Sequence, residues 1–134
     1  MRLESHRKRL EESLWALSRG VERGLEKWQR NIGFNTAAAM CDLLEMLLHK
    51  KNLIDPGSSI KHDSFKSENI ANDNLPFDFP HKKEILDIMV RIESRRNALC
   101  YGKPQTEKFI QSVLDDFNLL RSKLREAGLD EDKI

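Results

Sequence analysis

The sequence is poor in the residues that interrupt helices. Its 134 residues include six glycines and four prolines, and the prolines stand at positions 56, 76, 80 and 104, outside the long periodic stretches. Because both residue types destabilise helix interiors, this scarcity favours long helices. Cys41 and Cys100 have no metal-ligand spacing, so we expect two reduced, buried thiols, with a disulfide between them as the open alternative.

Membrane and secretion signals are also missing. No run of about eighteen apolar residues is present, which excludes a membrane-spanning helix from the sequence pattern. The opening stretch MRLESHRKRLEESL is too charged for a signal peptide. We therefore expect a cytoplasmic protein without a membrane partner. The net charge is +1, and the basic residues near the N-terminus are interrupted by acidic ones, which is typical of a solvated helix face rather than a nucleic-acid patch.

Common catalytic and ligand-binding motifs are absent as well. The sequence has no GxSxG, P-loop, GxGxxG or CxxC motif and no DNA-binding motif. Its histidines are not paired at three- or four-residue spacing, and no Glu-x-x-His pair of the di-iron kind occurs. We therefore expect no metal and no cofactor. The four histidines are His6, His49, His62 and His81.

What the sequence does contain is amphipathic helical periodicity. Hydrophobic residues make up 39% and charged residues 34%, as expected of a single folded domain with a core. Apolar stripes predict four helices. The first spans Leu3–Gln29 and is ended by Asn31, Ile32 and Gly33. The second runs to Asn52 from Asn35 or Thr36, either of which can cap it, and the third spans Pro80 or His81 to Gly102. The fourth runs from Gln105 or Thr106 to Ala127 and is closed by a left-handed Gly128 and an apolar contact from Leu129.

These helices predict an all-α fold, an antiparallel up-and-down four-helix bundle with a core over about residues 3–129 and a polar tail at 130–134. Residues 55–80 are expected to form a long irregular loop with a short helical turn near Lys61 to Glu68. Four apolar residues should pin that loop to the bundle: Phe65, Leu75, Phe77 and Phe79. The second helix is apolar around most of its girth, so it is either central or faces both the core and a second subunit.

One arginine breaks the pattern of the third predicted helix. At about 100° per residue, Arg96 falls within roughly 20° of the centre of the apolar stripe. A guanidinium there requires a partner or a wet cleft. Alternatively, Arg96 reaches water near the helix end or pairs with Glu93 on the surface. The other members of the stripe are Ile85, Ile88, Met89, Ile92 and Leu99.

The residues around Arg96 offer a cation, an amide and a phenol. Such a set can grip a phosphate backbone and position a hydroxyl group. The cluster consists of Glu93, Arg95, Arg96, Asn97 and Tyr101.

The segment RNALCYG, residues 96–102, resembles the R-N-x-x-x-H signature of the HEPN superfamily. Three further segments are similar to that family: NTAAAMCDLLEMLLHKK to its second helix, GSSIKHDSF to its loop, and FIQSVLDDFNLLRSKL to its last helix. The likeness covers residues 8–127, and its specific part is the Arg-Asn step.

This resemblance implies a symmetric homodimer of antiparallel bundles whose motif residues meet in a cleft. Active members are metal-independent ribonucleases, often toxins of toxin–antitoxin pairs or parts of RNA-based defence. Others are non-catalytic partners of small nucleotidyltransferases. Carried over by position, Arg96 would contact the scissile phosphate, and Asn97 would be the polar residue that follows it.

Tyr101 replaces the histidine of the family signature, and a phenol with a pKa near 10 is a poor base at neutral pH. Tyr101 can still orient a 2′-hydroxyl or stack on a base. We therefore consider Arg96, Asn97 and Tyr101 as catalytic candidates. RNA- or partner-binding candidates are Glu93, Arg95, Lys103 (where some members have tyrosine) and His62, the one replacement for the missing histidine that we consider.

Three hypotheses follow. The chain is an RNA-binding or RNA-cleaving dimer, a non-catalytic subunit that binds a nucleotidyltransferase or another protein, or an unrelated bundle in which Arg96 reaches into water.

Overall fold

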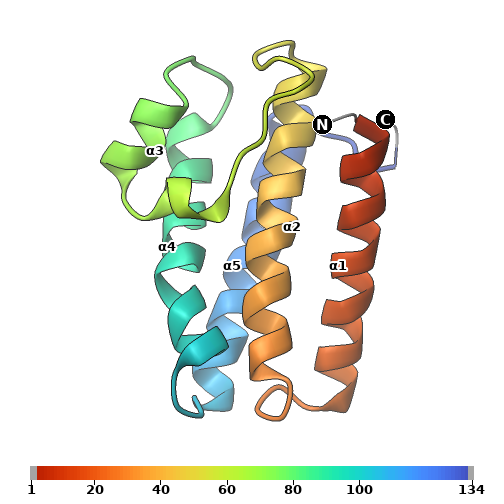
Figure 1. Ribbon diagram of the computed structural model, residues 1–134, viewed down its shortest axis with the longest axis vertical. Helices are drawn as coiled ribbons and strands as arrows, with labels where there is room; N and C mark the ends of the chain where they lie inside the picture. The colour runs from red at the N-terminus through yellow and green to blue at the C-terminus, as the bar shows by residue number, and fades with distance from the viewer. Residues whose placement is uncertain (1–2, 133–134) are drawn as a thin grey trace.

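The computed structural model describes residues 3–132, which contain five α-helices, one 3₁₀ helix and no strand (Figure 1). The all-α prediction is therefore confirmed. No helix within these residues is long and apolar enough to cross a membrane. The elements are α1 (Leu3–Arg23), α2 (Gln29–Lys50), η1 (His62–Phe65), α3 (Glu68–Asn74), α4 (Lys82–Tyr101) and α5 (Glu107–Glu126).

The four long helices lie side by side, and each runs opposite to the one before it (Figure 1). α2 is the central helix because it packs against α1, α4 and α5. Residues 39–48 of α2 are all buried. The apolar girth of this helix is thus explained by three neighbours within one chain.

α1 ends earlier than the sequence predicts, and α2 begins earlier. Gly24 has φ of +117°, a left-handed conformation that glycine adopts without strain and that ends the helix after Arg23. A turn follows, and α2 begins at Gln29. The predicted end of the first helix at Gln29 and the start of the second at Asn35 or Thr36 were therefore wrong. Residues 31–33 lie inside α2.

The polar residues that were expected to cap α2 bond within it instead. The Asn35 side chain donates to the Asn31 carbonyl at 2.9 Å, and Thr36 Oγ1 donates to the Ile32 carbonyl at 2.8 Å. Such back-bonding satisfies both side chains inside a helix.

The apolar stripe predicted for α1 is too wide. The spacing of Leu10, Leu14, Leu17 and Val21 predicts one stripe that includes Val21. Val21 is 53% exposed, so its assignment to the stripe was wrong. α1 packs closely against α2 alone among the described elements, and one neighbour requires only a narrow seam of buried residues. That seam is His6, Leu10, Ser13, Leu17 and Gly20.

Gly33 lets α2 and α4 approach each other closely. A Cβ atom at this position would lie 2.7 Å from Leu99 Cβ and 2.9 Å from Cys100 Sγ. Only a glycine fits such a contact, and it sets the register between the start of α2 and the end of α4.

We therefore expect Gly33→Ala to destabilise the protein by about 2 kcal/mol. Overpacking a tight contact costs up to about 3 kcal/mol, and the better helix propensity of alanine offsets about 1 kcal/mol of it. Urea unfolding of both proteins measures the difference. Gly57→Ala is the control, because a Cβ at Gly57 would contact nothing. Equal stability of Gly33→Ala and the parent would contradict the close contact.

Residues 55–80 contain more regular structure than predicted. The 3₁₀ helix η1 confirms the short helical turn, but α3 was not predicted, and the description of the segment as an irregular loop was wrong in that part. Ser67 caps α3 by accepting from the Ile70 amide at 3.1 Å. The predicted anchors are confirmed: Phe65, Leu75 and Phe79 are buried, and Phe77 packs against the core.

The ends of α4 and α5 agree closely with the sequence signals. Thr106 caps α5 by accepting from the Phe109 amide at 3.1 Å. Gly128 has φ of +115°, and Leu129 is buried behind it. The predicted tail is partly anchored, since Glu131 pairs with Arg121 at 2.7 Å. Residues 133–134 of that tail lie outside the described residues.

Candidate functional site

Arg96 lies on the side of α4 that faces α2 and is half-buried. Its guanidinium carbon is 5.1 Å from the centroid of the Phe34 ring. The five apolar residues that share its stripe are all buried. The arginine that breaks the pattern is therefore stacked on an aromatic ring at the α2–α4 seam, and its charge remains available at the surface.

Phe34 is the centre of a cluster of two arginines and two rings. Arg30 lies 5.6 Å from the Phe34 ring and 5.7 Å from the Tyr101 ring. Tyr101 meets Phe34 edge-on at 5.7 Å and is 66% exposed. We call Arg30, Phe34, Arg96 and Tyr101 the Arg96 surface. A shallow hollow of about 440 Å³, lined by Arg30 and Tyr101 among others, lies at its end.

His62 and Glu93 form a second pair on the same side of α4. Nδ1 of His62 lies 2.7 Å from one Glu93 oxygen and 2.8 Å from the other. The Glu93 side chain is 7% exposed, whereas that of His62 is 40% exposed. Because an ionised carboxylate only accepts, Nδ1 of His62 is the donor in this contact, and in the neutral imidazole Nε2 then carries the lone pair. Burial raises the pKa of Glu93, and the hydrogen bond from His62 opposes that rise.

The buried Glu93 links this pair to the Arg96 surface. Glu93 and Arg96 are three residues apart, so they are neighbours on one helix face, and the charge of Arg96 acts to lower the pKa of Glu93. His62 also lines a groove of about 340 Å³ between α2 and the 59–63 segment. Glu93 of α4 thus pairs with an imidazole from η1 and has the cation Arg96 one turn further along its own helix.

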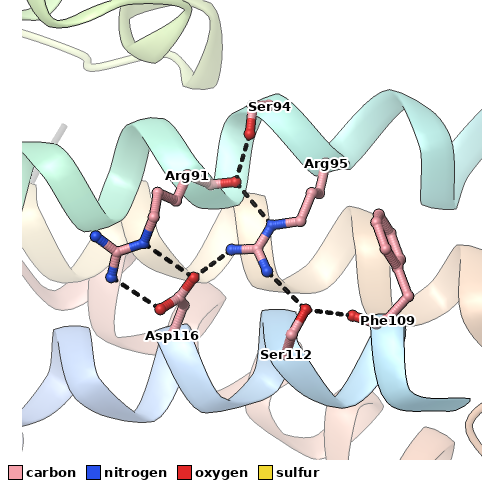
Figure 2. Close-up of polar contacts among 6 residues, drawn as sticks. All are labelled: Arg91, Ser94, Arg95, Phe109, Ser112 and Asp116. Carbon is pink, nitrogen blue, oxygen red and sulfur yellow. Dashed lines mark hydrogen bonds and ion pairs between the residues drawn. The ribbon is translucent and has the colours of Figure 1, made fainter.

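The other predicted site residues do not belong to this group of His62, Glu93 and Arg96. Arg95 points toward α5, where it binds Asp116 and donates to Ser112 Oγ at 2.8 Å (Figure 2). Asn97 and Lys103 are exposed. The backbone carbonyl of Lys103 accepts from the Gln29 side chain at 3.1 Å.

Arg95 instead belongs to a polar connection between α4 and α5. Arg91 donates to Asp116 at 2.9 Å, and Ser112 donates to the Phe109 carbonyl at 2.6 Å (Figure 2). Burial by itself raises the pKa of Asp116, but the hydrogen bonds from Arg91 and Arg95 outweigh burial and hold the pKa below its usual value.

We expect Asp116→Asn to destabilise the protein by about 1–2 kcal/mol at neutral pH. Because the pKa of Asp116 is lower in the folded than in the unfolded chain, its contribution is complete above the unfolded value of about 3.9. The contribution is lost as the pH falls through the folded value. Thermal unfolding at a series of pH values tests this: the difference between parent and variant should shrink below about pH 4. A difference that stays constant with pH would contradict it.

Several site residues were not identified from the sequence. Arg30 and Phe34 are four residues apart and therefore share a helix face, but the predicted helix boundaries placed them in a connection. Asp42 and Glu45 are charged residues inside an apolar run and are buried in the structure.

The two cysteines, Cys41 and Cys100, are buried, as predicted, and no disulfide joins them.

Comparisons of this chain with protein-family models, with curated proteins and with solved structures find no match.

Proposed function

We propose that this chain is an HEPN-like endoribonuclease that binds single-stranded RNA on the Arg96 surface and cleaves it with His62 as the base. The observation that carries the proposal is the contact of 2.7 Å between His62 and the buried Glu93, one helical turn from Arg96. His62 belongs to the 55–80 segment, and its imidazole would replace the one that the R-N-x-x-x-H signature has at the position of Tyr101.

In this mechanism Arg96 binds the scissile phosphate, and Arg30 adds a second positive charge nearby. Nε2 of His62 accepts the proton of the 2′-hydroxyl, and the 2′-oxygen attacks phosphorus. The 5′-oxygen of the next nucleotide leaves with the bonding electron pair and takes a proton from water, which gives a 2′,3′-cyclic phosphate. Glu93 orients the imidazole and stabilises its protonated form, as the carboxylate of a catalytic triad does.

The exposed ring of Tyr101 suits base stacking rather than proton transfer. Stacking of a base on an aromatic side chain contributes about 1–3 kcal/mol and tolerates different bases. Asn97 lies next to Arg96 in the chain and is exposed, so it is available to an RNA strand. Lys103 is available in the same way at the end of α4.

We further propose that the four long helices form an up-and-down four-helix bundle of the HEPN type. Two copies would pair through the α2–α4 side, so that the two Arg96 residues face one cleft. Ala38 and Tyr101 are exposed on that side. Sedimentation analysis tests the pairing, and a strict monomer at micromolar concentration would exclude a shared cleft.

Incubation with mixed RNA in the presence of a chelator tests the proposed activity. The parent protein should cleave RNA, and Arg96→Ala should reduce the rate by about 10²–10³, as expected when a group that stabilises transition-state charge is removed. Arg125→Ala, which removes an exposed arginine from the end of α5, should cleave at the parent rate. RNA left intact by the parent protein would contradict the proposal.

Intact RNA would favour the second candidate, a non-catalytic subunit that binds a nucleotidyltransferase or another protein. A specific feature supports it: Trp15 on α1 is 64% exposed, and tryptophan is enriched at the centres of protein interfaces. Binding of a nucleotidyltransferase by the parent chain, and its loss in Trp15→Ala, would establish that role.

A further inference from the structure

A polar cluster lies buried between α1 and α2, apart from the Arg96 surface. His6 is 1% exposed and Glu45 is 2% exposed, and polar groups in such surroundings are costly unless they have partners. Three members share one face of α2 at spacings of three and four residues. The cluster consists of His6 on α1 and Asp42, Glu45 and His49 on α2.

Three buried atoms of this cluster converge: two of them form an ion-pair contact, and the third, on His49, has no hydrogen-bond partner among residues 3–132. They are Nε2 of His6, Oε2 of Glu45 and Nε2 of His49, and they all lie within 4.8 Å of one another. The two imidazole rings are neighbours, with centroids 5.5 Å apart. Nε2 of His6 is 2.5 Å from Oε2 of Glu45.

A protonated His6 between two carboxylates would explain only part of this arrangement. Such an imidazolium would donate to Asp42 and to Glu45, which accounts for His6 and Glu45. It would leave Nε2 of His49 buried beside them with no hydrogen-bond partner among residues 3–132. A cation between the three atoms accounts for all of them, because each offers a lone pair toward the same point.

We propose that His6, Glu45 and His49 bind a divalent transition-metal ion, for which Zn²⁺ is the best fit. Two imidazoles and one carboxylate are an established type of zinc ligand set, with water as the fourth ligand. At Zn–ligand distances of about 2.0–2.2 Å, tetrahedral ligand atoms stand about 3.4 Å apart. The three side chains therefore need to shift by only about an ångström.

The surroundings support the three ligands. Oδ1 of Asp42 lies 3.0 Å from Nδ1 of His6, and a carboxylate on the far nitrogen typically orients a metal-binding histidine. The Ile60 amide donates to Oε1 of Glu45, which leaves Oε2 for the ion. The groove that His62 lines also reaches Asp42 and Glu45, two members of the cluster.

The ion would join α1 to α2. Because α1 packs closely against α2 alone among the described elements, a ligand from each helix would hold α1 in place. The site is separate from Arg96 and supplies no step of RNA cleavage, so this inference does not rest on the proposed function.

Metal titration of untagged, chelator-treated protein tests the proposal. The protein should bind one Zn²⁺ ion per chain, and its melting temperature should rise by about 5–10 °C in excess Zn²⁺. Co²⁺ should give the visible absorption of a tetrahedral site. His49→Gln should weaken Zn²⁺ binding by more than about 100-fold, and Asp42→Asn, which keeps all three ligands, by about 10–100-fold.

His81→Gln is the matched control, because His81 is exposed at the start of α4 and should leave binding unchanged. His49 is only partly buried, so its glutamine variant should fold, and the melting curve of the metal-free variant verifies this. Parent protein that binds no more Zn²⁺ than His49→Gln would overturn the proposal. Equal weakening by His81→Gln would also overturn it.

Discussion

Replacement of His62 by glutamine should lower the rate of RNA cleavage by about 10²–10⁴, the usual contribution of a general base. His62 is the only imidazole that the described structure places against Glu93, the carboxylate one helical turn from Arg96. Glutamine can still donate a hydrogen bond to Glu93 but cannot accept a proton from a hydroxyl. RNA affinity should therefore change little, since Arg96 and the aromatic rings remain. Single-turnover cleavage and filter binding measure the two effects separately.

Two further variants make this test specific. Glu93→Gln keeps an acceptor for His62 but removes the charge that stabilises its protonated form, so its rate should lie between those of the parent and His62→Gln. His81→Gln removes an exposed histidine outside the site and should cleave at the parent rate. Full activity of His62→Gln would refute the assignment of the base, and loss of binding would instead indicate a structural role for the 55–80 segment.

The parts of the fold that the sequence predicted are those set by local signals. The cap at Thr106, the left-handed Gly128 and the apolar stripes of α4 and α5 each lie within a few residues of the structure they determine. The boundary between α1 and α2 was wrong because Gly24 continues or ends a helix according to what surrounds it. Glycine is tolerated inside a helix and is also a common helix end, so no local pattern decided between the two.

This boundary error also hid part of the site. Arg30 and Phe34 could not be recognised as one helix face while Asn31 to Gly33 were interpreted as a helix end. Arg95 and Arg96 show a second limit, since adjacent residues point about 100° apart on a helix. Their adjacency in the sequence placed both in one candidate cluster, but the position of α5 shows that Arg95 instead meets Asp116. The pairing of His62 with Glu93 joins distant segments and required the structure.

The substitution Gln29→Leu should have the largest effect on stability. The Gln29 side-chain nitrogen lies 3.3, 3.2 and 3.1 Å from the carbonyls of Ala98, Leu99 and Lys103. Its oxygen accepts from the Gln105 amide at 2.7 Å. Helix carbonyls at a C-terminus need such partners. Leucine has a similar size but leaves them and the Gln105 amide unpaired. We expect a loss of about 2–4 kcal/mol, or a melting temperature lower by about 10 °C.

A matched substitution shows whether burial causes this loss. Gln111 on α5 is exposed, and its side chain bonds within its own helix, to Asp115 at 2.9 Å. Gln111→Leu should therefore change stability by at most about 0.5 kcal/mol. Because Gln29 holds the end of α4 where Tyr101 lies, Gln29→Leu should also weaken RNA binding at temperatures at which the chain is still folded. A Gln29→Leu protein as stable as Gln111→Leu would show that water replaces the amide at no cost. The α4–α5 turn would then be held by apolar packing alone.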